Sequence, residues 1–239
     1  MLASLKENWT KINELLIDRK EFNYLTPVNY RVSKEQKRWS FVSGEHVTGV
    51  VLDLGAGKLP ARRLLQPLAS YYVSVDRYPE HPELTLLGDA QSLPFKDRSF
   101  DTVHCISLLE HLPRPWEAAE EMARVLKKGG KVILRVPHIY YIHGQPHDYY
   151  RYTGFGVKSL FENAGLEVVS LVPHTGQVGF IASVPMTLML SLLYPCRPLF
   201  WAYYYVNKLL VILISRIDDA LASLERNYLP LSYTLIAKK

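Results

Sequence analysis

The sequence predicts an α/β fold in which a mostly parallel sheet carries helices on both faces. Short β-rich runs alternate with helical ones from residue 49 onward, and the β-rich runs are apolar almost throughout. Strands that are apolar on both sides belong to a buried parallel sheet, and the intervening helices supply the crossovers that such a sheet needs. We therefore expect one layered domain built around this sheet.

The expected elements follow from these patterns in chain order. The strands before residue 138 are 49–55, 71–76, 84–89, 100–107 and 131–137. Helices are expected at 58–69 and 114–128, and Gly129-Gly130 should end the second, because glycine is common just after a helix. A later helix at about 155–164 ends at Gly165, a strand follows at 166–172, and the last residues read as a strand.

The chain divides into four expected parts. Apolar positions at helical spacing predict a helix in 1–22, and a second short helix is expected at 34–42. The parts are N-terminal helices with a lid as a candidate role (1–48), the core (49–174), an apolar helical insertion (175–231) and the final strand of the core sheet (232–239).

Composition excludes several classes of protein. The chain has 239 residues, 48% of them apolar and 21% charged, which suits a globular core and excludes a disordered chain. A net charge of +5 is too small to argue for nucleic acid as a partner. Cys105 and Cys196 show no metal-type spacing and indicate a reducing compartment. Charges near the N-terminus argue against a secretory signal, so a cytoplasmic protein is expected.

A glycine-containing turn follows the first expected strand. Asp53-Leu54-Gly55-Ala56-Gly57 lets the backbone turn tightly and approach a ligand. A nicotinamide-binding fingerprint would need a third glycine at Pro60, which makes that cofactor the less favoured one. Asp76 closes the second strand, where a carboxylate can accept hydrogen bonds from both hydroxyls of a ribose, and Asp89 closes the third.

Four segments in this order resemble a known family. VLDLGAGKL, YYVSVD, GDAQSLPFKDRSFDTVHCISLLEHL and ARVLKKGGKVILRVP are similar to motifs of the class I S-adenosylmethionine-dependent methyltransferases. Within that class they resemble the small-molecule, quinone-methyltransferase-like group, methyltransferase type 11. The resemblance runs from about Val50 to Pro137. It implies a seven-stranded Rossmann-like sheet with an antiparallel last strand, S-adenosyl-L-methionine as cofactor, and methyl transfer.

The resemblance also assigns roles at the cofactor. It places the glycine turn around the methionine part, Asp76 on the ribose hydroxyls, and Asp89 beside the adenine. Leu59 stands where the family has its third glycine, and its side chain leaves less room for the backbone to approach the cofactor. The full expected set is Asp53, Gly55, Ala56, Gly57, Asp76, Arg77, Asp89, Ala90, Ser107 and Leu108.

Three regions should reach the methyl acceptor, because ligands bind beyond the carboxyl ends of parallel strands. They are Glu110-His111, His138, and the His- and Tyr-rich tract 143–153. Histidine is the usual base near neutral pH. The tract is expected to bind or cover the acceptor; the alternative is a structural loop with Asp148 and Arg151 as a helix-entry pair. The expected catalytic residues are His111, His147, Tyr150, Arg151 and His138.

No metal is expected. A metal held by His138, His143 and His147 is the alternative, and it lacks an evident further ligand in the sequence.

The insertion contains two apolar arms, 178–194 and 199–215. Each is shorter than the roughly 20 residues that a membrane-spanning helix needs, and Pro185 and Lys208 interrupt them. Because the chain returns to the sheet afterwards, a single span is excluded. We expect peripheral contact of 178–215 with the inner face of a membrane; the alternative is a buried helical cap or a homodimer interface.

The expected function is methylation of a small acceptor, apolar or lipid-linked, with O- or C-methylation favoured. The alternative is a non-catalytic binding or assembly protein that retains the methyltransferase fold.

Overall fold

The computed structural model describes residues 2–16, 19–31, 33–34, 45–174, 176–222 and 230–239. The chain forms two compact units. The core unit consists of 39–174 and 231–239, and the helical unit consists of 1–38 and 175–230. The expected short helix at 34–42 lies almost entirely outside the described residues.

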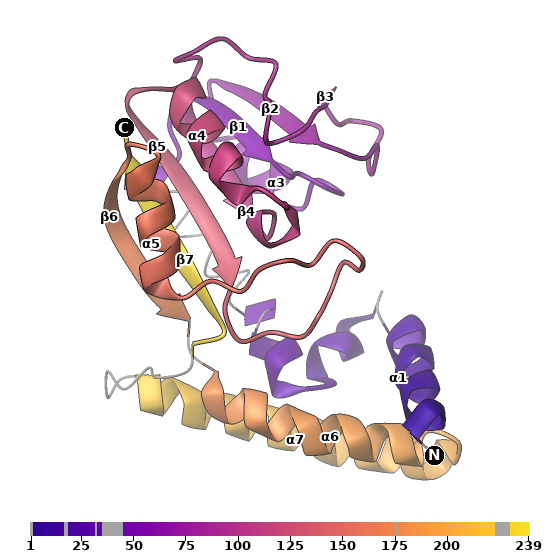
Figure 1. Ribbon diagram of the computed structural model, residues 1–239. Helices are drawn as coiled ribbons and strands as arrows, with labels where there is room; N and C mark the ends of the chain where they lie inside the picture. The colour runs from indigo at the N-terminus through magenta and orange to yellow at the C-terminus, as the bar shows by residue number, and fades with distance from the viewer. Residues whose placement is uncertain (1, 17–18, 32, 35–44, 175, 223–229) are drawn as a thin grey trace. The chain divides into compact units, whose positions relative to one another are not determined.

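The core unit is built on a seven-stranded sheet (Figure 1). Its strands are β1 Val50–Leu54, β2 Tyr71–Asp76, β3 Leu86–Leu87, β4 Phe100–Ile106, β5 Leu126–Pro137, β6 Glu167–His174 and β7 Ser232–Lys238. Their order is β3-β2-β1-β4-β5-β7-β6, and β7 runs antiparallel to both of its neighbours. The pairs among β1 to β5 are all parallel. The expected α/β fold with an antiparallel last strand is confirmed.

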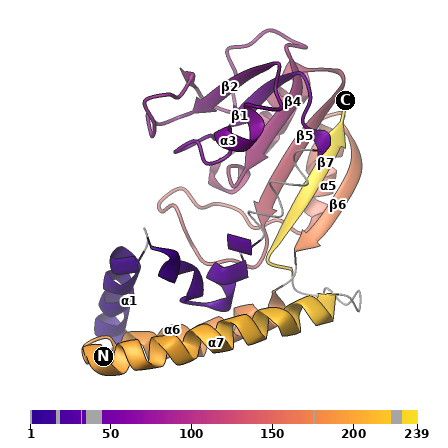
Figure 2. The ribbon, with the colours of Figure 1, turned by 180° about the vertical axis from the view of Figure 1, so that it is seen from behind.

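Helices lie against both faces of this sheet. Helices α4 (Pro115–Val125) and α5 (Gly154–Asn163) cover one face, where Met122 and Phe161 are fully buried with apolar side chains of the strands. The short α3 (Arg62–Leu65) lies on the other face (Figure 2). Its Leu65 is buried in one cluster with Val51 and Ile133. The alternation of faces along each strand explains why these runs are apolar on both sides.

The boundary between α4 and β5 differs from the expectation. The helix ends at Val125 and not at residue 128, and Gly129-Gly130 lies inside β5. These glycines pair with the end of β7: Gly129 donates to the Lys239 carbonyl, and Lys239 donates to the Gly130 carbonyl. A side chain on Gly130 would come within 3.0 Å of the Asp101 carbonyl. The two glycines therefore allow neighbouring strands to approach closely. The prediction that they end the helix was wrong.

The helical unit contains α1 (Leu2–Leu16), the 3₁₀ helix η1 (Lys20–Tyr24), α6 (Gln177–Leu193) and α7 (Arg197–Ala222). Its buried apolar cluster joins α1, α6 and α7 through Ile12, Leu16, Leu25, Leu190, Phe200 and Tyr204. The Asn207 side-chain amide donates to the carbonyls of Tyr24 and Leu25. One face of the α6–α7 pair is thus taken by its own unit.

The second apolar arm is longer than expected. α7 is one continuous helix of 26 residues. Lys208 lies inside it, and its ammonium group lies over the Tyr24 ring, 4.4 Å from the centroid. By length and composition Arg197–Leu221 could cross a membrane, whereas α6 is shorter. The expectation that both arms are too short to span was therefore wrong for α7.

Candidate functional site

The glycine turn after β1 is tied to β2. Gly55 and Ala56 both donate to the Val75 carbonyl, at 2.9 and 3.1 Å. Gly55 has φ +73°, and a side chain there would come within 3.0 Å of the Leu108 side chain. Gly57 has φ +47°, and a side chain there would meet nothing within 4 Å. The turn is therefore packed on one side and open on the other, as a loop that receives a ligand must be.

Leu59 adopts a left-handed backbone conformation. Its φ is +57°, the left-handed region that glycine prefers. A leucine in this region costs roughly 1–2 kcal/mol. Leu59 is only 6% exposed, so burial of its side chain offsets that cost.

Asp76 connects the end of β2 to the glycine turn. Its Oδ2 accepts a hydrogen bond from the Gly57 backbone at 2.8 Å, and its Oδ1 accepts one from the Tyr78 backbone at 3.0 Å. A carboxylate oxygen has two lone pairs, so each oxygen retains one for a further donor. The two backbone donors fix the carboxylate in orientation while leaving it able to accept a pair of hydroxyls.

The loop after β3 is held to the start of α4. Asp89 Oδ1 accepts from the Gln91 backbone at 2.9 Å, and the Gln91 side-chain oxygen accepts from the Arg114 backbone at 3.1 Å. Ala90 is buried, and Arg77 is exposed beyond the end of β2. Asp89 is partly exposed, as a group that contacts a ligand needs to be.

Asp53 is engaged inside the core unit. It is 3% exposed, its Oδ1 lies 2.8 Å from His104 Nδ1, and its Oδ2 accepts from the Tyr72 hydroxyl at 2.7 Å. The parallel register places Asp53 beside His104 on adjacent strands. Burial and the nearby carboxylate raise the pKa of Tyr72, which keeps this hydroxyl a donor. These hydrogen bonds link β1, β2 and β4; a role for Asp53 at the methionine part stays a prediction.

The end of β4 leads into the acceptor side. Ser107 is exposed at φ +51°, and its backbone donates to the Arg135 carbonyl. Next comes the 3₁₀ helix η2 (Leu109–His111). The Glu110 side chain is fully buried, and neither carboxylate oxygen has a hydrogen-bond partner within the described residues. His143 Nε2 lies 3.6 Å and His111 Nε2 lies 3.9 Å from Glu110 Oε1.

Residues 138–153, which include the tract 143–153, are folded around Arg151. The guanidinium holds Asp148 through two hydrogen bonds of 2.6 and 2.8 Å. It also donates to the carbonyls of Tyr141 and Tyr150. Asp148 accepts from the His143 backbone as well, and Arg151 keeps the pKa of Asp148 far below its ordinary value. The alternative role of Asp148 and Arg151, a pair just before helix α5, therefore has direct geometric support.

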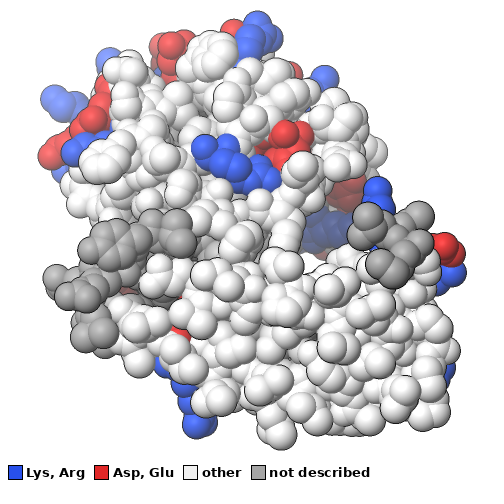
Figure 3. Space-filling model, turned by 60° about the horizontal axis from the view of Figure 1, so that its bottom comes forward, with Lys and Arg blue, Asp and Glu red and all other residues white. Residues whose placement is uncertain are grey.

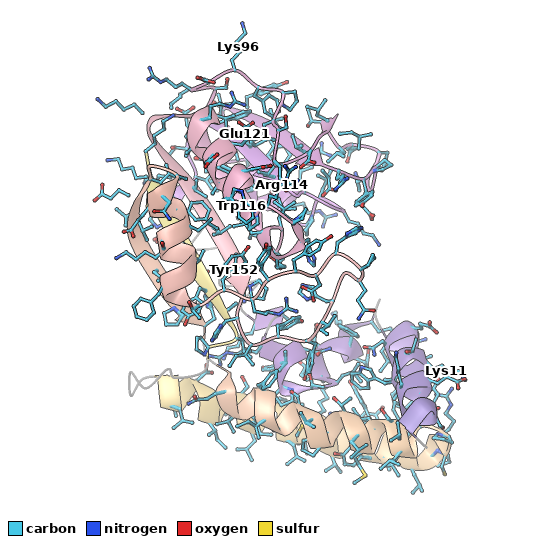
Figure 4. All side chains as sticks on the ribbon, in the orientation of Figure 1. Lys11, Lys96, Arg114, Trp116, Glu121 and Tyr152 are labelled. Atoms are coloured by element: carbon cyan, nitrogen blue, oxygen red, sulfur yellow. The ribbon has the colours of Figure 1, made fainter. Side chains whose placement is uncertain are left out.

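Backbone hydrogen bonds fasten the tract to η2. Tyr149 and Tyr150 both donate to the Glu110 carbonyl, and the hydroxyl of Tyr152, labelled in Figure 4, donates to the Leu109 carbonyl at 3.0 Å. The His147 carbonyl lies 2.5 Å from His111 Nδ1. The structure thus brings Glu110, His111, His143 and His147 together, although sequence alone separated them into two regions.

Two expected catalytic side chains have other contacts. The Tyr150 hydroxyl donates to the Pro113 carbonyl at 3.1 Å. His138 lies beside the Tyr233 ring, with ring centroids 5.6 Å apart, and its buried Nδ1 has no hydrogen-bond partner within the described residues. Neither observation tests the expected roles, which stay predictions.

Arg151→Met is expected to destabilise the core unit. The substitution leaves the Asp148 carboxylate, 3% exposed, without its counter-charge, and the free energy of unfolding should fall by up to about 3 kcal/mol. Urea unfolding measures this loss. The control is Lys158→Met, which removes the exposed Lys158–Glu162 pair and should cost less than about 1 kcal/mol. Equal losses in both variants would contradict the role assigned to Arg151.

Comparison with known proteins indicates the family. Residues 52–134 match the model of a methyltransferase domain. An uncharacterized methyltransferase of Mycobacterium tuberculosis is 30% identical over 108 residues, which are 40% of this chain and 42% of that protein. A solved S-adenosylmethionine-dependent methyltransferase from Archaeoglobus fulgidus has the same fold, with a TM-score of 0.55 and 17% identity over 87% of this chain and 94% of that one. Residues 52–134 therefore match a methyltransferase domain, and the sheet has the fold of the S-adenosylmethionine-dependent methyltransferases.

A third relative has a more specific name. A 27-O-demethylrifamycin SV methyltransferase of Amycolatopsis mediterranei is 44% identical over 47 residues, 20% of this chain and 17% of that protein. The chain spans about two fifths of the length of the first curated relatives that it matches.

The family implies S-adenosylmethionine as the cofactor of this protein. The residues present fit that molecule. Gly57 has open space beside it, and Asp76 keeps acceptor capacity for two hydroxyls next to the same turn. Leu108 closes the other side of the turn against Gly55.

Proposed function

We propose that the protein transfers a methyl group from S-adenosylmethionine to a small acceptor that is apolar or lipid-linked, with an oxygen or carbon atom as the favoured methylation point. The observation that carries the acceptor class is the exposed apolar surface of the helical unit. Methyl transfer is an in-line displacement, so the protein has to align the acceptor and exclude water.

This surface, the apolar face, consists of exposed side chains of α6 and α7, between 38 and 69% exposed. They are Ile181, Val184, Leu188, Met189, Leu192, Leu199, Tyr205, Val206, Leu209, Leu210, Leu213 and Ile217. Figure 3 shows a broad surface of the helical unit without charged side chains. Contiguous apolar surface of this extent marks an interaction site.

The charge of the two helices favours an anionic membrane surface as the partner. Residues 176–217 contain Arg197, Lys208 and Arg216 and no acidic residue. Basic residues beside an apolar helix face attract anionic lipid. The rest of the helix surface is occupied within the unit, where Asn207 and Asp218 are buried and hydrogen-bonded.

We propose that α6 and α7 lie in the plane of the membrane rather than cross it. α7 alone is long enough to span. Spanning would expose its buried Asn207 and Asp218 to hydrocarbon, which is costly for polar groups. A helix pair with one apolar face and the other face covered by protein suits the interface instead. The core unit would then work at the cytosolic face, where S-adenosylmethionine is made.

Labelled cofactor tests the acceptor class. The purified protein is incubated with S-adenosylmethionine that carries a trideuterated methyl group and with a total lipid extract. We expect the label in a product that partitions into organic solvent, found by mass spectrometry and absent with Asp76→Ala. Label confined to water-soluble compounds would contradict the lipid-linked acceptor and leave methyl transfer standing.

The non-catalytic alternative rests on Leu59 at the family's third glycine. Leu59 has the left-handed backbone conformation that glycine prefers, which supports the catalytic proposal. The Amycolatopsis relative is named a 27-O-demethylrifamycin SV methyltransferase, and this name supports an oxygen atom as the methylation point.

A further inference from the structure

Glu110, His111 and His143 place three potential metal ligands together on the acceptor side of the core unit. One ligand atom of each lies within 4.8 Å of the others. The two imidazole rings stand edge to face with centroids 4.8 Å apart. The His111 ring packs closely against Gly144, where an added side chain would come within 2.7 Å of His111 Cε1.

Backbone carbonyls determine which nitrogen of each ring carries hydrogen. His111 Nδ1 lies 2.5 Å from the His147 carbonyl, and His143 Nδ1 lies 3.1 Å from the Tyr141 carbonyl. A carbonyl oxygen can only accept, so both Nδ1 atoms must donate. The Arg151 guanidinium is also 3.4 Å from His143 Nδ1, but it donates over shorter distances to Asp148 and Tyr141. In the neutral form each ring therefore presents an unprotonated Nε2 to Glu110, whereas the hydrogen bond to Glu110 raises the pKa of His143 and favours a proton at the position that a bound cation would take.

With both rings neutral, this arrangement has no positive charge at its centre. Two nitrogen lone pairs and a buried carboxylate face one another, and neither Glu110 oxygen has a hydrogen-bond partner among the described residues. A buried carboxylate without a hydrogen-bond partner is costly, and buried charges are usually paired or coordinate metals. The hydrogen bonds at Nδ1 are the kind that orient metal-binding histidines.

We propose that Glu110, His111 and His143 bind a first-row divalent metal ion of the Zn²⁺ type. Two imidazoles and one carboxylate are a ligand set typical of zinc sites that keep a coordination position open. Small side-chain rotations must bring the ligand atoms closer, since zinc binds nitrogen and oxygen at about 2.0–2.2 Å. The proposal replaces the sequence-based expectation of no metal and of His138 and His147 as the alternative ligands.

The ion would act on the acceptor. This step rests on the proposed function. The open coordination position of the ion would take an acceptor hydroxyl and lower its pKa, which favours the oxygen nucleophile needed for methylation. A hydroxyl-bearing acceptor follows as the substrate class. The hydroxyl proton leaves to water or a nearby base, and the oxygen forms the new bond to carbon as the carbon–sulfur bond breaks.

Zn²⁺ titration of the full-length protein tests the site. Protein stripped with a chelator is titrated against a competing colorimetric zinc indicator, and Co²⁺ is added separately to read the absorption spectrum of the bound ion. We expect one ion for each chain. Removal of a hydrogen bond that only supports a metal ligand lowers metal affinity by roughly 10–100-fold. Glu110→Gln and His143→Ala remove a ligand itself, so their affinity for Zn²⁺ should fall further.

Controls keep the result interpretable. Cys196→Ser and His81→Asn remove other exposed or partly exposed ligand types and should bind Zn²⁺ like the wild type. Circular dichroism checks folding, and the isosteric Glu110→Gln guards against collapse of the pocket. The proposal would be overturned if the wild type did not bind Zn²⁺, or if both site variants bound it as tightly as the wild type. A protonated histidine would then be the partner of Glu110. Cofactor calorimetry on the same metal-free protein tests the proposed function separately.

Discussion

Asp76→Ala is expected to reduce the affinity for S-adenosylmethionine by more than about a hundredfold. The Asp76 carboxylate is oriented by the Gly57 and Tyr78 backbones and keeps one lone pair on each oxygen for a ribose hydroxyl. Hydrogen bonds to a charged group contribute about 1.5–3 kcal/mol each, and two of them exceed the roughly 2.8 kcal/mol that a hundredfold change requires. Isothermal titration calorimetry measures the affinity.

Two further variants separate the carboxylate's binding role from a general loss of structure. Asp97→Ala removes an exposed carboxylate of the same unit, paired with Arg124, and should bind the cofactor like the wild type. Asp76→Asn keeps the shape but turns one acceptor into a donor that faces a backbone N–H, so it should bind almost as weakly as Asp76→Ala. Unchanged affinity in both Asp76 variants, with the fold intact, would remove Asp76 from the site.

The triple variant Val206→Asn, Leu209→Asn, Leu213→Asn is expected to lose membrane binding. These side chains are 54, 69 and 54% exposed on the apolar face. Transfer of a half-exposed side chain of this size into lipid is worth about 1 kcal/mol, so the three together change partitioning by roughly a hundredfold. Flotation with vesicles containing anionic lipid measures the bound fraction. Asparagine adds no charge, so electrostatic attraction is unaltered.

A matched triple variant identifies the face that binds. Leu68→Asn, Tyr71→Asn and Val169→Asn also remove exposed apolar side chains, but from the core unit. This protein should float like the wild type. A wild-type protein that stays soluble as a dimer, and whose α7 triple variant is a monomer, would show instead that the apolar face is a subunit interface.

Local patterns were enough to predict β1, β2 and β4, whereas the helix expected at 58–69 is only Arg62–Leu65 and the strand expected at 84–89 is only Leu86–Leu87. β2 occupies the expected residues 71–76, and β1 and β4 fall within the expected runs, because apolar strands ending in glycine or an acid carry a strong signal. The contact between Gly57 and Asp76 follows from the same pattern, since adjacent parallel strands end at one edge of the sheet. Chain topology therefore explains why the expected cofactor region was recognisable.

Long-range contacts were not predictable in this way. Gly129-Gly130 resembles a helix end, and only pairing with Lys239 makes it part of a strand. The meeting of Glu110 with His143 depends on the path of the tract, which Arg151 and Asp148 determine. Two histidine-containing motifs, far apart in the sequence, indicate a binding or catalytic site. Their sequence does not say which imidazole rings approach the same carboxylate.

The most direct test of the account is calorimetry of the wild-type protein with S-adenosylmethionine and with its demethylated product. We expect saturable binding of both molecules at one site for each chain, because the open side of Gly57 and the acceptor capacity of Asp76 serve the nucleoside that they share. A folded wild-type protein that takes up neither molecule would contradict the assignment of this chain as an active methyltransferase.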